Sequence, residues 1–194
     1  RTPAELQGVK RALAEQGLVR APDFKLWMMV EVPSNVLILD RFIDVGIDGI
    51  SIGSNDLTQL VLGVDRDSEK LAETFDERNE AVMLAIQTAV TTARRRGLTV
   101  SICGQAPSVY PEVTERLVEW GATSVSVSPD MIDQTREIIA DAEAKLGRAP
   151  LPRYVEKSLC RLGDGLAQTG LISADGFRRT VEALRRFQAI AHAM

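Results

Sequence analysis

One stretch decides the fold: residues 24–56, which read FKLWMMVEVPSNVLILDRFIDVGIDGISIGSND. It opens with an apolar run from Phe24 to Val32, which is bounded by turn-forming residues and is short enough for a buried strand. A helix is expected from about Asn35 to Val45, ended by Gly46. A second apolar strand, Gly49 to Ile52, follows it. Strand, helix and strand in this order predict a βα unit with parallel strands.

The same pattern returns three more times along the chain. The expected pairs are strand 49–52 with helix 79–96, strand 99–103 with helix 111–120, and strand 124–128 with helix 131–146. Four βα units in series predict an α/β fold with a parallel sheet. Each strand passes directly into small and polar residues. Ligands of parallel α/β folds gather at the C-terminal ends of the strands, so we expect the functional site there.

The two ends of the chain read differently from this repeat. Thr2-Pro3-Ala4-Glu5 is a capping box that predicts a first helix ending near Gly17. After Gly147 a proline-punctuated linker leads into a helical C-terminal tail. The sequence therefore predicts two parts, a βα domain over residues 1–147 and a linker with a helical tail over residues 148–194.

Length and composition narrow the class of protein. The 194 residues are fewer than the roughly 250 of a complete (β/α)₈ barrel, while a hydrophobic fraction of 45% is enough for a packed core. The net charge of −4 and the interrupted apolar stretches exclude a nucleic-acid-binding field and a membrane span. Two cysteines and one histidine exclude a disulfide framework and a histidine-rich metal site. A cytoplasmic location is expected.

Two carboxylates follow neighbouring strands. Glu31 interrupts an apolar sequence at the end of its strand, and Asp56 occupies the corresponding place after the next one. An unpaired buried carboxylate is costly, so such residues need a cation or hydrogen-bond donors. Together with waters and substrate oxygens, the pair suits Mg²⁺. Taken singly, Glu31 could instead pair with a basic residue, and Asp56 could cap a helix.

Cys103 and Arg66 are the other candidates for chemistry. Cys103 ends the third strand directly before Gly104. It is either a small buried hydrophobe or a proton donor to an enolate, since thiols in general are mostly protonated at neutral pH. Arg66 lies in the long segment after the second strand, between two aspartates. It could present a bidentate fork to a phosphate or be neutralised at the surface.

Four motifs resemble the PEP-utilizing enzymes. They are Met28-Met29-Val30-Glu31-Val32-Pro33-Ser34, residues 51–59 (SIGSNDLTQ), residues 62–67 (LGVDRD) and residues 102–108 (ICGQAPS). Within that family they look most like phosphoenolpyruvate synthase, or pyruvate, water dikinase. The motifs occur in the family's order over about residues 1 to 146, which makes the resemblance specific.

The resemblance implies a role for each matching position. Glu31 and Asp56 would ligate Mg²⁺, which bridges to pyruvate or phosphoenolpyruvate. Arg66 would hold the transferring phosphoryl group, and Cys103 would exchange the proton at C3. The substrate itself would be held by Gly53, Ser54 and Asn55. These roles agree with the chemistry, because a metal ion and an arginine stabilise developing negative charge.

The resemblance also implies what surrounds this chain. In the family this domain is a complete (β/α)₈ TIM barrel, and the motifs belong to its strands five to eight, so the chain is expected to begin in the helix before strand five. The parent reaction, ATP, pyruvate and water to AMP, phosphoenolpyruvate and phosphate, also uses a phosphohistidine domain and a nucleotide-binding domain. Two exposed sheet edges would favour a homo-oligomer, and a catalytically incomplete assembly module is the alternative.

A second resemblance lies in the tail. Residues 156–191 look like an internal helical piece of the exopolyphosphatase family, without that family's phosphate loops or a matching catalytic glutamate. No activity carries over from it. A weaker reading is polyphosphate binding through the arginines of the tail.

Overall fold

The computed structural model describes residues 2–17, 25–66 and 74–147. The chain divides into two compact units, residues 1–136 and 137–194. The first unit holds the whole sheet and the predicted site residues. Of the second unit, the described part is the remainder of the last helix and the turn that follows it.

Each described strand is followed by two helical elements before the next strand or the end of the described chain. Along the chain they are α1 (Pro3–Glu15), β1 (Trp27–Val30), α2 (Pro33–Leu37), α3 (Leu39–Asp44), β2 (Gly49–Gly53), α4 (Ser54–Leu62), α5 (Glu80–Arg95), β3 (Thr99–Cys103), α6 (Ala106–Val109), α7 (Pro111–Trp120), β4 (Ser124–Val125), the 3-10 turn η2 (Pro129–Met131) and α8 (Ile132–Lys145).

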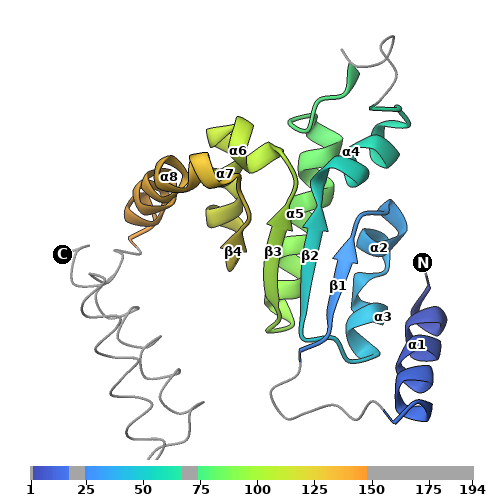
Figure 1. Cartoon of the computed structure of the whole chain (residues 1–194). Helices are drawn as coiled ribbons and strands as arrows, with labels where there is room; N and C mark the ends of the chain where they lie inside the picture. Colours follow the sequence, from blue (N-terminus) through green and yellow to red (C-terminus); the bar gives the residue numbers. More distant parts are fainter. Residues whose placement is uncertain (1, 18–24, 67–73, 148–194) are drawn as a thin grey trace, which may run out of the picture. The chain divides into compact units, whose positions relative to one another are not determined.

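The four strands form one parallel sheet in the order β1-β2-β3-β4 (Figure 1). Neighbours in the sheet are neighbours in sequence, as in one continuous half of a (β/α)₈ barrel. Helices connect the strands, because parallel strands need crossover connections. The prediction of an α/β fold with four βα units, consistent with half of a TIM barrel, is confirmed.

The two faces of the sheet differ in burial. One face carries Ile50, Ile52, Val100 and Ile102, each 0% exposed. Helix α5 contacts β2 and β3 and runs along them (Figure 1). On the opposite face of β1, Trp27 is 40% exposed and Met29 is 42% exposed. The prediction that the whole apolar run is buried is therefore wrong for alternate residues, since no described element covers that face.

Helix boundaries follow the capping signals in the sequence. Thr2 Oγ1 accepts a hydrogen bond from the Glu5 N–H, and Glu5 Oε2 accepts one from the Thr2 N–H, which is the predicted capping box of α1. Asn79 caps α5 by accepting from the Ala81 N–H at 2.9 Å. Gly63, with φ of +64°, ends α4 in the left-handed conformation that glycine adopts without strain.

Several elements differ from their predicted extents. The helix expected at 35–45 is two helices, because Ile38 has the non-helical angles φ −122° and ψ 29°. The strand expected at 124–128 is only Ser124–Val125, although the Ser126 N–H still donates to Ile102 O. Two helices, α4 and α6, were not predicted. Helix α4 begins directly after β2, and two residues separate the end of β3 from the start of α6. The polar residues at these strand ends indicate a ligand-binding loop as readily as a helix start.

The tail from residue 148 to residue 194 lies outside the described residues. The predicted domain boundary after residue 147, the helical tail, the arginines within it and the exopolyphosphatase-like segment 156–191 thus stay predictions. Among the residues that the structure does describe, no helix combines the length and the apolar character needed to cross a membrane.

Candidate functional site

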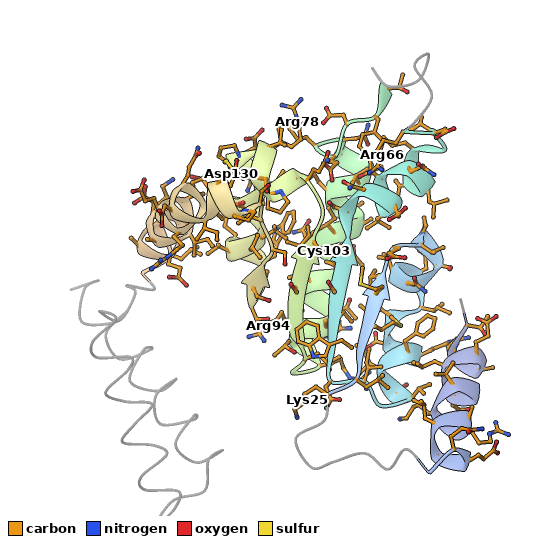
Figure 2. All side chains as sticks on the ribbon, in the orientation of Figure 1. Lys25, Arg66, Arg78, Arg94, Cys103 and Asp130 are labelled. Atoms are coloured by element: carbon orange, nitrogen blue, oxygen red, sulfur yellow. The ribbon has the colours of Figure 1, made fainter. Side chains whose placement is uncertain are left out.

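The C-terminal ends of β1, β2 and β3 lie side by side. The register pairs Gly53 with Cys103, so the residues that follow these two strands emerge together. Figure 2 shows Arg66 and Arg78 at the end toward which β2 and β3 run, with Lys25 at the opposite end of the sheet. This edge is the one at which parallel α/β folds bind ligands.

Glu31 leaves β1 with its side chain against Gly53. A Cβ built on Gly53 would lie 2.7 Å from Glu31 Cγ and 3.3 Å from Oε1, so only a glycine leaves room for this carboxylate. Glu31 is half-buried. Within residues 2–17, 25–66 and 74–147, no basic side chain or hydrogen-bond donor pairs with it. The alternative reading, pairing with a basic residue, thus has no partner in the described part of the chain.

Asp56 lies in the first turn of α4 and is exposed. The N-cap of this helix is Gly53, and no side chain makes a capping hydrogen bond to the helix start. Asp56 is therefore not the capping residue that the alternative reading required. A carboxylate in the first turn still benefits from the helix dipole. The structure brings Asp56 to the same strand-to-helix junction against which Glu31 packs.

Glu31 and Asp56 are of the ligand type that a hard divalent cation takes. Carboxylate oxygens are the ligands Mg²⁺ prefers, and Mg²⁺ commonly keeps several waters while taking only one or two carboxylates. No group of three or more His, Cys, Asp or Glu side chains that could hold a metal occurs among the described residues. Waters or substrate oxygens would have to complete a shell around Glu31 and Asp56.

A buried carboxylate joins the residues at the start of α4. Glu77, in the turn before α5, is 3% exposed, and its Oε1 accepts a hydrogen bond from Ser54 Oγ at 2.6 Å. With its amide nitrogen toward Glu77, Asn55 donates to the same oxygen at 3.1 Å and its own oxygen accepts from Arg66 Nη1 at 3.0 Å. In the opposite orientation the Asn55 oxygen would face the carboxylate and accept only a 3.4 Å bond from the Gln105 N–H.

The pKa of the Glu77 carboxyl is raised by burial, which penalises the charged form. Hydrogen bonds from Ser54 and from the Ala106 N–H oppose this rise, as does the positive charge of Arg66. Glu77 therefore receives donors from two strand ends, after β2 and after β3. This is how the chain satisfies a carboxylate that burial alone would make costly.

Arg66 is exposed and sits just beyond α4. Its N–H donates to Gln59 Oε1 at 3.3 Å, and its guanidinium donates to Asn55. The side chain is thereby directed back toward the strand ends. Both readings of Arg66, a phosphate-binding fork and neutralisation by the flanking aspartates, stay predictions, because Asp67 lies outside the described residues.

Gly104 is required by the close approach of Ser54. Gly104 has φ of +135°, and a Cβ there would lie far closer to Ser54 Oγ than van der Waals contact allows. The glycine thus lets the turn after β3 pass directly over the start of α4. The same contact leaves Ser54 fully buried.

Cys103 is a free thiol of intermediate exposure at the last position of β3. Ser51 Oγ donates to Cys103 Sγ at 3.4 Å, across the face of the sheet opposite α5. The simplest alternative, a fully buried small hydrophobe, does not describe this residue. Its thiol lies on the same face of the sheet as Trp27 and Met29.

Reasoning from sequence missed Glu77. The long segment after β2 holds several acidic residues, and nothing in Phe75-Asp76-Glu77-Arg78 separates Glu77 from its acidic neighbour Asp76. The structure separates them: Asp76 is only partly buried and pairs with Arg78, which lowers the pKa of the Asp76 carboxyl. Only the tertiary fold shows which carboxylate turns inward.

Comparison with known proteins gives a consistent picture. Residues 2–144 match the family described as PEP-utilising enzyme, PEP-binding domain. The probable phosphoenolpyruvate synthase of Staphylothermus marinus is 52% identical over 159 residues, which cover 81% of this chain and 19% of that protein. The phosphoenolpyruvate synthase of Aeropyrum pernix is 52% identical over 148 residues, covering 75% of this chain and 18% of the relative. The phosphoenolpyruvate synthase of Escherichia coli is 46% identical over 136 residues, covering 70% of this chain and 17% of the relative. The chain thus spans less than a fifth of the length of these curated relatives.

Proposed function

Because the chain belongs to the PEP-utilising enzymes, through their PEP-binding domain, we propose that it forms the Mg²⁺- and enolate-binding part of a phosphoenolpyruvate-synthase-like phosphotransferase. The parent reaction converts ATP, pyruvate and water to AMP, phosphoenolpyruvate and phosphate. This chain covers 19% of one such relative, so further domains, one carrying a phosphohistidine and one binding the nucleotide, are its proposed partners.

The observation that carries the proposal is the packing of Glu31 against Gly53. It places one carboxylate at the junction from which the backbone enters α4 with Ser54, Asn55 and Asp56 in succession. In the proposed site Glu31 and Asp56 hold Mg²⁺, which stabilises negative charge on the oxygens of an enolate when bound.

The other residues act on the substrate directly. The Gly53 backbone and Asn55 bind the substrate, and Arg66 offsets charge on the phosphoryl group. Ser54 stays in the proposed set, although its hydroxyl already donates to Glu77. Cys103 donates or removes the proton at C3 of pyruvate, on the face of the sheet where Ser51 donates a hydrogen bond to its sulfur.

Oxalate mimics the enolate of pyruvate and gives a test on the full chain. Mg²⁺ should strengthen oxalate binding at least tenfold, and the double variant Glu31→Ala with Asp56→Ala should abolish that gain. Glu15→Ala with Asp133→Ala is the matched control, since it removes the same charge from exposed positions on α1 and α8. Oxalate binding that survives loss of Glu31 and Asp56 unchanged would reject the proposed site.

A second candidate function is favoured by the exposed face of the sheet. Trp27 and Met29 are large apolar side chains with 40% and 42% exposure, and β1 and β4 are the edges of the four-stranded sheet. In this reading the chain is an assembly module whose sheet pairs with another copy. Sedimentation should then show a homo-oligomer that Trp27→Ser weakens, and a monomer at all concentrations would contradict it.

A further inference from the structure

Glu77 is the most deeply buried carboxylate of the described residues, and the proposed chemistry leaves it without a role. It is 3% exposed, while Glu31 is half-buried and Asp56 exposed. A side chain so enclosed is poorly placed to touch a substrate. Its contacts instead all lead to residues at the strand ends.

The Oε1 atom of Glu77 accepts two hydrogen bonds from consecutive residues. Ser54 Oγ donates at 2.6 Å and the Asn55 amide nitrogen donates at 3.1 Å. The backbone N–H of Ala106, at the start of α6, also donates to this carboxylate. One side chain thus ties the turn before α5 to the segments that leave β2 and β3.

The bond to Asn55 decides which way that amide faces. Because a carboxylate oxygen only accepts, it selects the amide nitrogen and turns the Asn55 oxygen outward. That oxygen then accepts from Arg66 Nη1 at 3.0 Å. A chain of bonds therefore runs from Glu77 through Asn55 to Arg66.

We propose that Glu77 is a positioning residue of this site, which fixes the Asn55 amide and, through it, the Arg66 guanidinium that would receive a phosphoryl group. The assignment rests on the proposed function for its ligand, while the chain of bonds stands on geometry alone. A carboxylate that only stabilises the turn before α5 would affect all parts of the site alike. A positioning Glu77 affects chiefly the groups that it reaches through Asn55, above all Arg66.

The first arm of the test needs no ligand. In the full chain, ¹⁵N relaxation of the Asn55 side-chain amide measures whether that amide is held. Glu77→Ala should lower its order parameter below about 0.6, the range of flexible groups. Glu77→Gln should leave the order parameter unchanged, because an amide oxygen in place of Oε1 still accepts from Ser54 and Asn55. Asp76→Ala is the control, since the adjacent Asp76 pairs with Arg78.

The second arm compares two ligands, each with Mg²⁺. Phosphoenolpyruvate carries the phosphoryl group and oxalate does not. Glu77→Ala should weaken phosphoenolpyruvate binding at least tenfold and oxalate binding by a clearly smaller factor, and Glu77→Gln should restore both. In an Arg66→Ala background, Glu77→Ala should change phosphoenolpyruvate binding less than threefold, because the group through which it acts is gone.

The outcomes separate the two claims. An Asn55 amide that stays rigid in Glu77→Ala, or a tenfold loss of phosphoenolpyruvate binding in both Arg66 backgrounds, would overturn the positioning role. If the unsubstituted chain binds neither ligand, the proposed function fails, while the relaxation arm still decides the role of Glu77. Should Glu77→Ala not fold, Glu77→Asp replaces it: the charge is kept, but the oxygen no longer reaches Asn55, so the same loss of order is expected.

Discussion

At the scale of single residues, glycines set how closely the strand ends approach one another. Gly53 makes room for the Glu31 side chain, and Gly104 makes room for Ser54. Both close approaches lie at the proposed site. Gly63, by contrast, is needed only for its backbone conformation. It ends α4 with a positive φ, and no atom lies within 4 Å of where a Cβ would stand.

These two kinds of glycine predict different costs of substitution. Gly63→Ala should lower the free energy of unfolding by about 1 kcal/mol, the cost of the left-handed conformation alone. Gly104→Ala should cost roughly 3 kcal/mol or more, because backbone strain is joined by the clash with Ser54. Urea unfolding of the two variants measures the difference. Equal losses in unfolding free energy would show that a Cβ at residue 104 does not clash with Ser54.

The raised pKa of Glu77 predicts a pH dependence of stability. In the unfolded chain this carboxyl titrates near its ordinary value of 4.5, and in the folded chain it titrates higher. The folded state therefore binds the proton more tightly, so the contribution of Glu77 is fully present below pH 4.5 and is lost as the pH rises through the folded pKa.

Glu77→Gln removes that titration. The difference in unfolding free energy, unsubstituted chain minus variant, should fall as the pH rises above 4.5 and then level off. Urea unfolding at a series of pH values gives this difference directly. A difference that rises with pH would mean that the hydrogen bonds from Ser54 and Ala106 outweigh burial.

Sequence predicts where the candidate residues lie better than how they are connected, and their roles stay predictions. Glu31, Asp56 and Cys103 stand at or just after the ends of apolar runs, and the structure places them at the corresponding ends of neighbouring strands. Glu77 could not be found, since the choice between it and Asp76 depends on which carboxylate the fold encloses. Local pattern predicts position along an element, whereas burial is a property of the assembled structure.

At the scale of elements, α5 is the helix on which the sheet depends. It contacts β2 and β3 as well as α2, α3, α4 and α7. Its buried stripe includes Val82, Ile86 and Val90, each 0% exposed. By contrast, α1 has no buried residue, and its contacts among the described elements are chiefly with α3.

This contrast predicts different consequences for two caps of the same kind. Asn79→Ala removes the cap of α5 and should lower global stability by about 1 kcal/mol. Thr2→Ala removes the capping box of α1 and should destabilise that helix by a similar free energy, but it should increase the local opening of α1 alone. Native-state hydrogen exchange separates the two: protection of β2 and β3 amides should fall in the first variant only. A fall in both would show that α1 and the sheet unfold together.

The elements that sequence predicted well have strong periodicity and clear stops. Helix α7 ends where predicted, at Trp120 before Gly121, and α5 ends at Arg95, one residue before its predicted end. Helix α4 escaped prediction because Ser54, Asn55 and Asp56 suit a ligand loop and the first turn of a helix equally, and in the structure they form the first turn of α4. The break at Ile38 has no proline or glycine to mark it, so only the packed structure reveals two helices there.

At the scale of the whole chain, two observations fit half of a barrel: one face of the sheet is exposed, and the chain aligns with only part of each relative. A closed barrel would bury both faces of every strand, whereas here Trp27 and Met29 remain exposed. The chain matches 19%, 18% and 17% of three phosphoenolpyruvate synthases. The exposed strand face is what half of such a barrel presents when no described element packs against it.

The claim that this half of a barrel holds a metal-dependent ligand site meets its most direct test in one calorimetric titration. Oxalate is added to the full chain with saturating Mg²⁺ and again with the divalent cation removed by chelation. We predict that the dissociation constant with Mg²⁺ is at least tenfold lower, because Glu31 and Asp56 bind oxalate only through the cation. The same dissociation constant in both titrations, or no heat of binding in either, would contradict the proposed site.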